Sequence, residues 1–217
     1  ISNYETRDEK NIGLRTYLSV ERPEGQRREL ELSAQLGFEG QRMGSEIANY
    51  DNLAGSAGTR QAYNKVSAYQ YFPFLRGNLT WRDRLVVHAA VSVNFNGYRF
   101  RDDTGIRNDF DPVWMPHVGV NYRVIDPLTL RITISRGYST PTMAEIRPTD
   151  NKIYEDLQPE KGWNTEAGVR ANLMNGRFVL DASVFRYRLT DGILSRVNES
   201  GDTYFVNAGA IRQIGVE

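Results

Sequence analysis

The sequence predicts an all-β protein, an antiparallel meander of about nine long strands. Apolar and polar residues alternate with period two over many runs, several of them longer than ten residues, which is the pattern of a strand with two different faces. The chain also has 12 Tyr, 9 Phe, 3 Trp and 19 Gly, a composition typical of all-β architectures. Few long segments have the period of a helix.

The predicted strands follow one another along the whole chain. In the clearest one, Leu85, Val87 and Ala89 point one way while His88 and Ser92 point the other. Pro73 interrupts the alternation of the third run and predicts a bulge or an exposed stretch. Residues 141–146 are predicted to form one helical turn in a loop. The strands are expected at 12–21, 28–40, 65–82, 84–101, 113–125, 127–138, 162–174, 177–196 and 203–217.

The predicted connections alternate between short and long. Short ones are expected at 23–26, 82–84, 125–127 and 175–176, the last an Asn-Gly pair typical of a two-residue hairpin. Long ones are expected at 41–64, 102–112, 139–161 and 197–202. Short turns on one edge and long loops on the other are typical of an outer-membrane barrel. A soluble β-sandwich also alternates, but its strands usually have about 5–6 residues, so the pattern favours the barrel.

Composition excludes several classes of function. The 27 basic and 27 acidic residues give a net charge of zero, so no charge argument supports binding to nucleic acid. The chain has no cysteine, which excludes disulfides and cysteine-based metal or nucleophile sites. No apolar run approaches the roughly 18 residues of a membrane helix. A barrel strand needs only about 10 residues of alternating pattern, so the absence of such a run does not exclude a membrane barrel.

Motifs in residues 116–217 resemble one family. The segment RGYSTPTMAEI begins at Arg136, and LQPE, EAG, DGI, VNAG and GVE follow in order. Phe185 lies between EAG and DGI. Their order and spacing resemble the C-terminal part of the barrel of TonB-dependent outer-membrane receptors. Before residue 60 the chain matches this family only in its alternating pattern.

The resemblance implies that residues 1–217 are a partial section of a roughly 22-stranded transmembrane β-barrel, without the plug and the remaining strands. Such receptors lie in the outer membrane of Gram-negative bacteria, surrounded by its lipid. They import a small-molecule cargo, namely a ferric siderophore, haem, cobalamin or a glycan, and a periplasmic TonB-type energy transducer acts with the plug domain. An isolated section would have two unpaired strand edges, so we expect it to form an open sheet or to self-associate edge to edge.

Two other functions are compatible with a barrel. One is a porin-like channel or another outer-membrane barrel without a transducer; an upstream plug and a transducer-binding segment would distinguish the receptor from it. The other is a barrel enzyme, for which the sequence offers no catalytic constellation. Ser92 and His88 share a strand face but are about 13 Å apart at strand spacing, too far for proton transfer.

The candidate site residues rest mainly on their positions. Arg147, Lys152 and Tyr154 lie in the longest predicted loop and are candidate contacts to cargo. His88 and His117 lack further ligands at suitable spacing, which favours solvated or hydrogen-bonded histidines over metal or haem ligands.

Three further groups of residues have structural interpretations. Residues 52–60 lack the ending of a phosphate-binding loop and are predicted to form a flexible extracellular loop. Aromatic residues near strand ends suit the two interfacial girdles of a barrel; these are Trp81, Trp114, Tyr138 and Trp163. Acidic residues flank one long loop and could bind a cation, although the EF-hand spacing is absent; these are Asp102, Asp103, Asp109 and Asp111.

Overall fold

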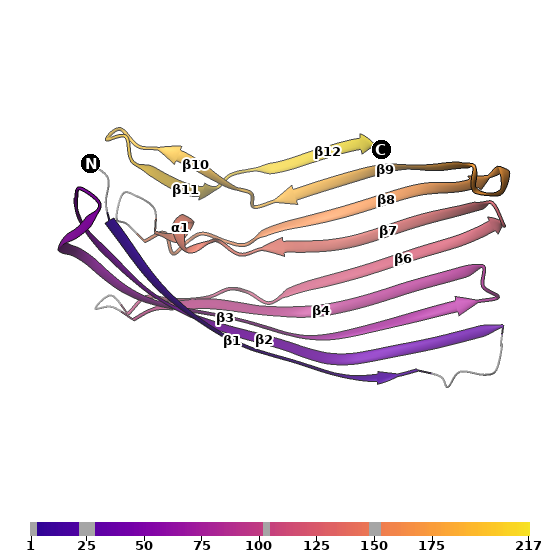
Figure 1. The fold of residues 1–217 in the computed structure, drawn as a ribbon, viewed down its shortest axis with the longest axis horizontal. Helices are drawn as coiled ribbons and strands as arrows, with labels where there is room; N and C mark the ends of the chain where they lie inside the picture. The colour runs from indigo at the N-terminus through magenta and orange to yellow at the C-terminus, as the bar shows by residue number, and fades with distance from the viewer. Residues whose placement is uncertain (1–3, 22–28, 102–104, 148–152) are drawn as a thin grey trace. The chain divides into compact units, whose positions relative to one another are not determined.

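The structure, a computed structural model, describes residues 4–21, 29–101, 105–147 and 153–217. Nine strands pair in one antiparallel sheet in the order β1-β2-β3-β4-β6-β7-β8-β9-β12 (Figure 1), with the short β5 paired to β4. Strands β10 and β11 form a separate two-stranded sheet. The predicted antiparallel meander is therefore confirmed.

The long strands exceed what a bilayer crossing requires. Strand β2 has 24 residues and β3 has 26, whereas a tilted strand crosses a membrane with about 9–11. The elements are β1 (Tyr4–Val20), β2 (Leu30–Leu53), β3 (Ser56–Trp81), β4 (Leu85–Phe100), β5 (Arg107–Asp109), β6 (Val113–Ile125), β7 (Leu128–Ser139), α1 (Met143–Ile146), β8 (Glu160–Leu173), the single 3₁₀ turn η1 (Met174–Gly176), β9 (Phe178–Thr190), β10 (Ile193–Val197), β11 (Thr203–Asn207) and β12 (Ala210–Val216). No helix within the four described ranges is long and apolar enough to span a membrane.

Two compact units divide the chain. The first contains residues 1–16, 38–73 and 94–112, and the second contains residues 17–37, 74–93 and 113–217. Strands β1 to β4 therefore contribute residues to both units.

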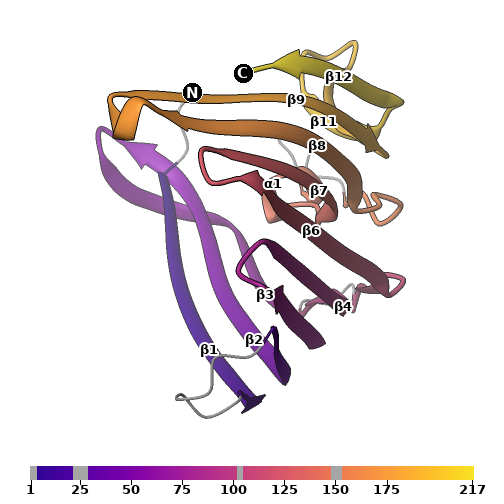
Figure 2. The same ribbon diagram turned by 90° about the vertical axis from the view of Figure 1, so that its right-hand side faces the viewer.

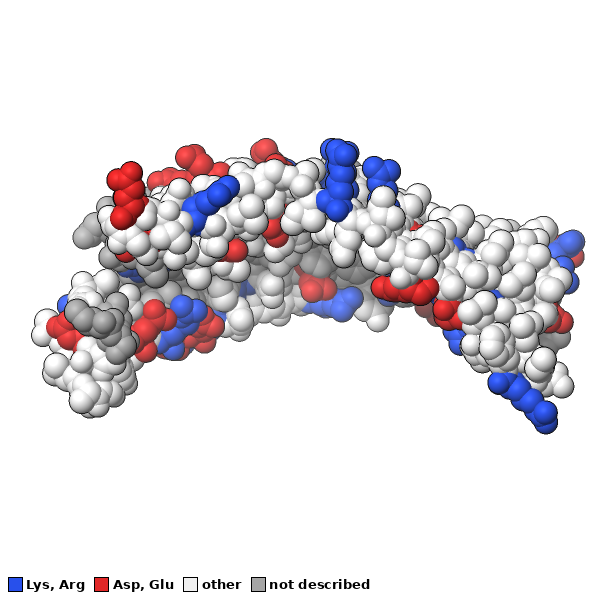
Figure 3. Space-filling model, turned by 90° about the horizontal axis from the view of Figure 1, so that it is seen from above, with Lys and Arg blue, Asp and Glu red and all other residues white. Residues whose placement is uncertain are grey.

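In the second unit the sheet has its apolar face outward. Strands β6 to β9 lie side by side (Figure 2). On β7, Leu130, Ile132 and Ile134 are exposed, Ile132 by 52%, while Arg131 and Thr133 between them are half-buried. A soluble sheet would bury its apolar face. Seen from the side on which β12 lies in Figure 1, charged side chains form separate spots among mostly uncharged residues (Figure 3). The exposed apolar face is therefore the surface that would contact lipid.

In the first unit the same division of faces includes aromatic side chains. The rings of Phe38, Tyr71 and Phe95 stack across β2, β3 and β4, with centroid distances of 6.1 and 4.9 Å. The neighbouring positions Asn94 and Asn96 on β4 are buried. The buried aromatic core of this unit consists of Tyr98, Phe100 and Phe110.

The predicted long connection at 41–64 is wrong, as is the flexible loop at 52–60. Strand β2 continues to Leu53 and β3 begins at Ser56, so Ala54 and Gly55 alone form the turn. Both have positive φ, 52° and 93°, and the Gly55 N–H donates to Asn52 Oδ1 at 2.7 Å. Residues near this turn are exposed on both strand faces. Because neither face selects apolar residues, the segment has no period-two signal.

Two predicted strands prove to be interrupted. The run at 177–196 breaks after Thr190, where Asp191 has a φ of 58°, and the run at 203–217 breaks at Gly209, with a φ of 77°. The excised pieces pair with each other as β10 and β11. The two-residue turn expected at 175–176 is instead a four-residue connection, 174–177, in which the first three residues have positive φ.

The other elements agree with the predictions more closely, although β1 begins at Tyr4 and not at residue 12. Residues 82–84 and 126–127 form short turns, and the predicted helical turn is α1, whose N-cap Thr142 and Glu145 form a capping box. Pro73 lies at an exposed position within β3. The expected long connection at 102–112 contains the short strand β5. The connection expected at 23–26 lies outside the described residues.

The exposure pattern of β7 predicts how charge is tolerated. Arginine at the lipid-facing position 132 should lower the free energy of unfolding by about 2–4 kcal/mol if the position lies near the bilayer midplane. Arginine at the adjacent position 133, on the polar face, should lower the free energy of unfolding much less. Urea unfolding of full-length Ile132→Arg and Thr133→Arg variants in lipid vesicles measures the difference. Equal losses would contradict the assignment of the two faces.

Candidate functional site

A charged cluster lies on the polar face of β7, β8 and β9. Arg131 Nη1 lies 2.5 Å from Asp181 Oδ1, and Arg131 Nε lies 3.4 Å from Glu166 Oε1. These side chains are partly exposed, so water and solutes can reach them. Gly168 is the register partner of Arg131, and a Cβ there would lie 2.6 Å from Arg131 Nε. The EAG motif therefore supplies a carboxylate for Arg131 and the room for its side chain.

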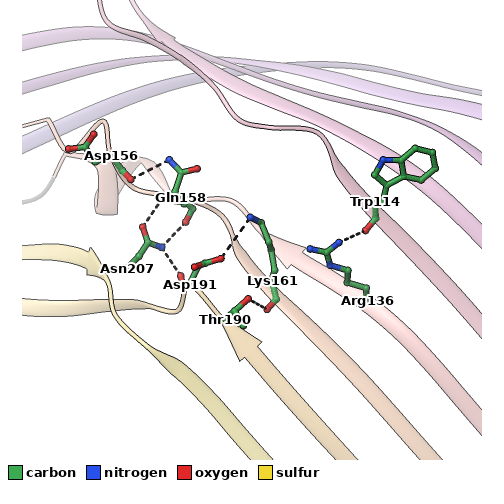
Figure 4. A network of polar contacts seen from close by, with 8 residues as sticks. All are labelled: Trp114, Arg136, Asp156, Gln158, Lys161, Thr190, Asp191 and Asn207. Carbon is green, nitrogen blue, oxygen red and sulfur yellow. Dashed lines mark hydrogen bonds and ion pairs between the residues drawn. The ribbon is translucent and has the colours of Figure 1, made fainter.

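A second polar network joins the long connections of the second unit (Figure 4). Asn207 Oδ1 accepts from the Gln158 N–H at 2.7 Å, and Asn207 Nδ2 donates to the Gln158 carbonyl at 2.8 Å. The same amide nitrogen donates to the Asp191 carbonyl at 2.6 Å. One side chain thus satisfies backbone groups in two other segments, much as a neighbouring strand would.

Adjacent contacts extend this network to the strand ends. Glu160 Oε1 accepts from the Ile193 N–H at 2.7 Å. Lys161 Nζ lies 3.8 Å from Asp191 Oδ2, and the Thr190 hydroxyl donates to the Lys161 carbonyl at 3.2 Å (Figure 4). The LQPE, DGI and VNAG motifs therefore meet in space, which gives a structural reason for their occurrence together.

The structure brings two of the predicted cargo contacts to this region. The Arg147 N–H donates to the Met143 carbonyl at 2.9 Å at the end of α1. The Tyr154 N–H donates to the Ile146 carbonyl at 2.8 Å, and its ring stacks on Tyr204 with centroids 5.9 Å apart. Lys152 lies outside the described residues. Sequence reasoning missed Tyr204, which lies 50 positions from its stacking partner in a separate hairpin.

Ile146 and Leu157 hold this region in place. Ile146 is completely buried and Leu157 nearly so. They flank the segment that carries Tyr154, so α1 and the LQPE motif each insert one apolar anchor. The candidate surface is therefore made by short segments fixed at both ends.

Aromatic side chains mark the same end of the sheet. Trp114 and Trp163, near the starts of β6 and β8, are exposed, and Tyr138 lies near the end of the intervening β7. Arg136 Nη1 donates to the Trp114 carbonyl at 3.3 Å, and its guanidinium carbon lies 5.8 Å from the Trp163 ring centroid (Figure 4). Trp81, also exposed, ends β3 at a short connection. All four residues therefore lie near strand ends, a position that suits an interfacial girdle.

The other candidate residues have local roles in the structure. His88 Nδ1 lies 2.6 Å from Asn78 Oδ1, and His117 is exposed on β6. The Asp109 carboxylate is held by Arg107 and by the Tyr69 hydroxyl, each at 2.7 Å, and these bonds, that from Arg107 first, lower its pKa. It is therefore already neutralised by protein groups.

The remaining acidic candidates form no metal centre within the part of the chain that the structure describes. Asp102 and Asp103 lie outside the described residues. Within the described ranges, no three His, Cys, Asp or Glu side chains gather as metal ligands.

Asn207 can be tested by its effect on one backbone amide. Asn207→Ala removes the acceptor for the Gln158 N–H and should cost about 1 kcal/mol per hydrogen bond lost. Asn207→Asp keeps that acceptor but cannot donate to the two carbonyls. Hydrogen exchange should therefore be faster at Gln158 in the alanine variant than in the aspartate variant. Wild-type exchange at Gln158 in the alanine variant would refute the proposed role of this side chain.

Comparison with known proteins places the chain in a family. Residues 2–217 match the family model described as TonB dependent receptor-like, beta-barrel. The ferripyoverdine receptor of Pseudomonas aeruginosa bound to ferripyoverdine is 17% identical with a TM-score of 0.73, and 99% of this chain covers 30% of that one. The alcaligin outer membrane receptor FauA from Bordetella pertussis is 18% identical with a TM-score of 0.65, with coverages of 99% and 36%. The copper transporter OprC is 15% identical with a TM-score of 0.70, with coverages of 98% and 35%.

The chain thus spans about a third of the length of these solved structures. The structural likeness establishes the fold, and the family match covers nearly every residue of the sequence. Members of this family are outer-membrane proteins of Gram-negative bacteria, which agrees with the exposed apolar face and the aromatic girdle. The chain belongs to the TonB-dependent receptor β-barrel family.

Proposed function

We propose that this chain forms part of the wall of an outer-membrane receptor that binds and imports a scarce small-molecule nutrient. The observation that carries the proposal is the sheet of β6 to β9, with apolar side chains exposed on one face and the paired charges of Arg131, Glu166 and Asp181 on the other. Such a wall separates lipid from a polar path. The plug domain and a TonB-type energy transducer belong to the proposed mechanism of the full-length receptor.

The cargo class is proposed from chemistry and from the solved relatives. Those relatives are a ferripyoverdine receptor, an alcaligin receptor and a copper transporter. A metal chelate is thus the favoured cargo, with haem, cobalamin and glycans as the other candidates. Within this chain, Arg147, Lys152 and Tyr154 are the proposed contacts, since the cationic and aromatic side chains suit an anionic, ring-bearing chelate.

Growth of a deletion strain tests the proposed transport. Loss of the full-length gene should abolish growth when one of these compounds is the sole source of iron, cobalamin or carbon, and the wild-type gene should restore it. Loss of the energy transducer should have the same effect. Uptake that continues without the transducer would indicate a porin-like channel, and turnover of the compound by the purified protein would indicate an enzyme.

Tyr154 allows a matched test of the cargo contact. Tyr154→Ala removes the ring that stacks on Tyr204. The loss of an aromatic contact should raise the cargo concentration at half-maximal uptake about tenfold. Tyr154→Phe keeps the ring and should retain most of the affinity. The measurement is uptake of labelled cargo by cells with equal receptor levels. Unchanged half-saturation in the alanine variant would exclude Tyr154 from the cargo site.

A further inference from the structure

The two histidines of the chain lie on neighbouring strands of the second unit, His88 on β4 and His117 on β6 (Figure 1). The Arg123 N–H donates to the Arg84 carbonyl at 2.7 Å, and this bond gives the register of the two antiparallel strands. Arg84 stands four residues before His88, and Arg123 stands four residues after Gly119. His88 is therefore opposite Gly119, and His117 is its diagonal neighbour.

Both imidazole rings lie on the polar face of the sheet. Residues directly opposite each other share a face, so His88 lies on the side that a Cβ at Gly119 would occupy. His117 lies on the same side, because its Nε2 would be 3.8 Å from that Cβ. Thr133, the register partner of Gly119 on β7, has its Oγ1 at 3.8 Å from the same point. The His117 ring is therefore directed toward the position that faces His88.

Small residues leave space between the two rings. Gly119 stands opposite His88, and the same register places Ala90 opposite His117. Diagonal neighbours in an antiparallel pair lie about 7–8 Å apart. Two imidazoles directed toward each other across this separation can share one metal ion, at about 2.0–2.1 Å from each nitrogen. Both histidines are exposed, so an ion can reach them.

Asn78 on β3 determines which nitrogen of His88 is available to a ligand. Asn78 Oδ1 lies 2.6 Å from His88 Nδ1 and can only accept, so Nδ1 carries the proton. Asn78 Nδ2 donates to the Ser33 hydroxyl at 3.0 Å, which holds the amide in this orientation. The lone pair of the neutral ring is therefore on Nε2. Metal-binding histidines usually have such a partner for their other nitrogen.

We propose that His88 and His117 bind one divalent transition-metal ion on the polar face of the sheet, through the Nε2 atom of each ring. Imidazole nitrogens suit Cu²⁺, Zn²⁺ and Ni²⁺, and Cu²⁺ binds most tightly of these three. Within the described ranges no third His, Cys, Asp or Glu joins them as a ligand, so water completes the coordination. The site goes beyond the proposed import of a chelate, since it takes a free ion and does not use the proposed cargo contacts.

Titration of the full-length receptor with Cu²⁺, in detergent and without an affinity tag, tests the proposal. Calorimetry counts the bound ions, and electron paramagnetic resonance counts the nitrogens coupled to each ion. The wild type should bind one ion with two coupled imidazole nitrogens, and both His88→Gln and His117→Gln should lose it. The double variant should lose the same single ion, because both rings hold it. Loss of a different ion in each single variant, or unchanged binding in both, would overturn the proposal.

Asn78 gives a test that keeps both histidines. Asn78→Ala removes the acceptor for His88 Nδ1 and should weaken Cu²⁺ binding about tenfold, as the loss of such a partner does at other metal sites. Asn78→Asp keeps an acceptor oxygen at this position and should retain the binding. Equal weakening by both substitutions would contradict the role assigned to this side chain.

Gly119 gives a second test that removes no ligand. A Cβ there meets its neighbours only at ordinary contact distance, so Gly119→Val can fold while its methyl groups occupy the space between the rings. Cu²⁺ binding should weaken at least tenfold. Gly44→Val is the matched control, since Gly44 lies on β2 in the first unit and a Cβ there meets no atom within 4 Å. Undiminished affinity in Gly119→Val would also overturn the proposal.

Discussion

The constraint on which this structure depends is that every backbone N–H and C=O facing lipid must be paired within the sheet. Strands β7 and β8 satisfy it by unbroken register from Leu128 opposite Ala171 to Ser139 opposite Glu160. Once the backbone is paired, each residue contributes its side chain to one of two faces only. On β7 the outward face carries Leu130, Ile132 and Ile134, whereas Arg131 lies on the other face and pairs there with Glu166 and Asp181.

Glycines accommodate the large side chains of that polar face. The Tyr187 ring lies over Gly162, where a Cβ would be 2.6 Å from its hydroxyl, and Phe185 lies over Gly215, where a Cβ would be 2.5 Å from the ring. Gly168 makes the same room for Arg131. In each case a long side chain lies over a glycine of the neighbouring strand. The glycine is the register partner of Arg131 and of Phe185, whereas Gly162 lies two residues from Asn164, the register partner of Tyr187. The motif glycines in EAG and GVE are thus packing positions rather than turns.

The sequence predicted the meander and the polar and apolar faces because lipid and water select different residues at alternate positions. The prediction is wrong for the segment 41–64, where a loop is expected from the sequence. Near its turn this segment is exposed on both faces, so lipid and water do not select different residues at alternate positions. The breaks at Asp191 and Gly209 depend on positive φ angles, which the identity of a single residue does not predict. The bond between Asn207 and Gln158 joins residues 49 positions apart, and no local pattern specifies such a pairing. The motif resemblance located these residues without giving their physical role.

The motif residues hydrogen-bond to backbone groups, and these bonds limit what the residues can do in transport. Both polar atoms of the Asn207 amide are bound to backbone groups, and one Glu160 oxygen is bound to the Ile193 N–H. A cargo molecule would have to break these bonds to use the same atoms, and each loss would leave a backbone group unsatisfied. Cargo is therefore bound more favourably by side chains outside this hydrogen-bond network than by the side chains that form it. A single barrel framework can in this way present different contact residues, since the hydrogen bonds that fix the loop bases do not depend on the cargo.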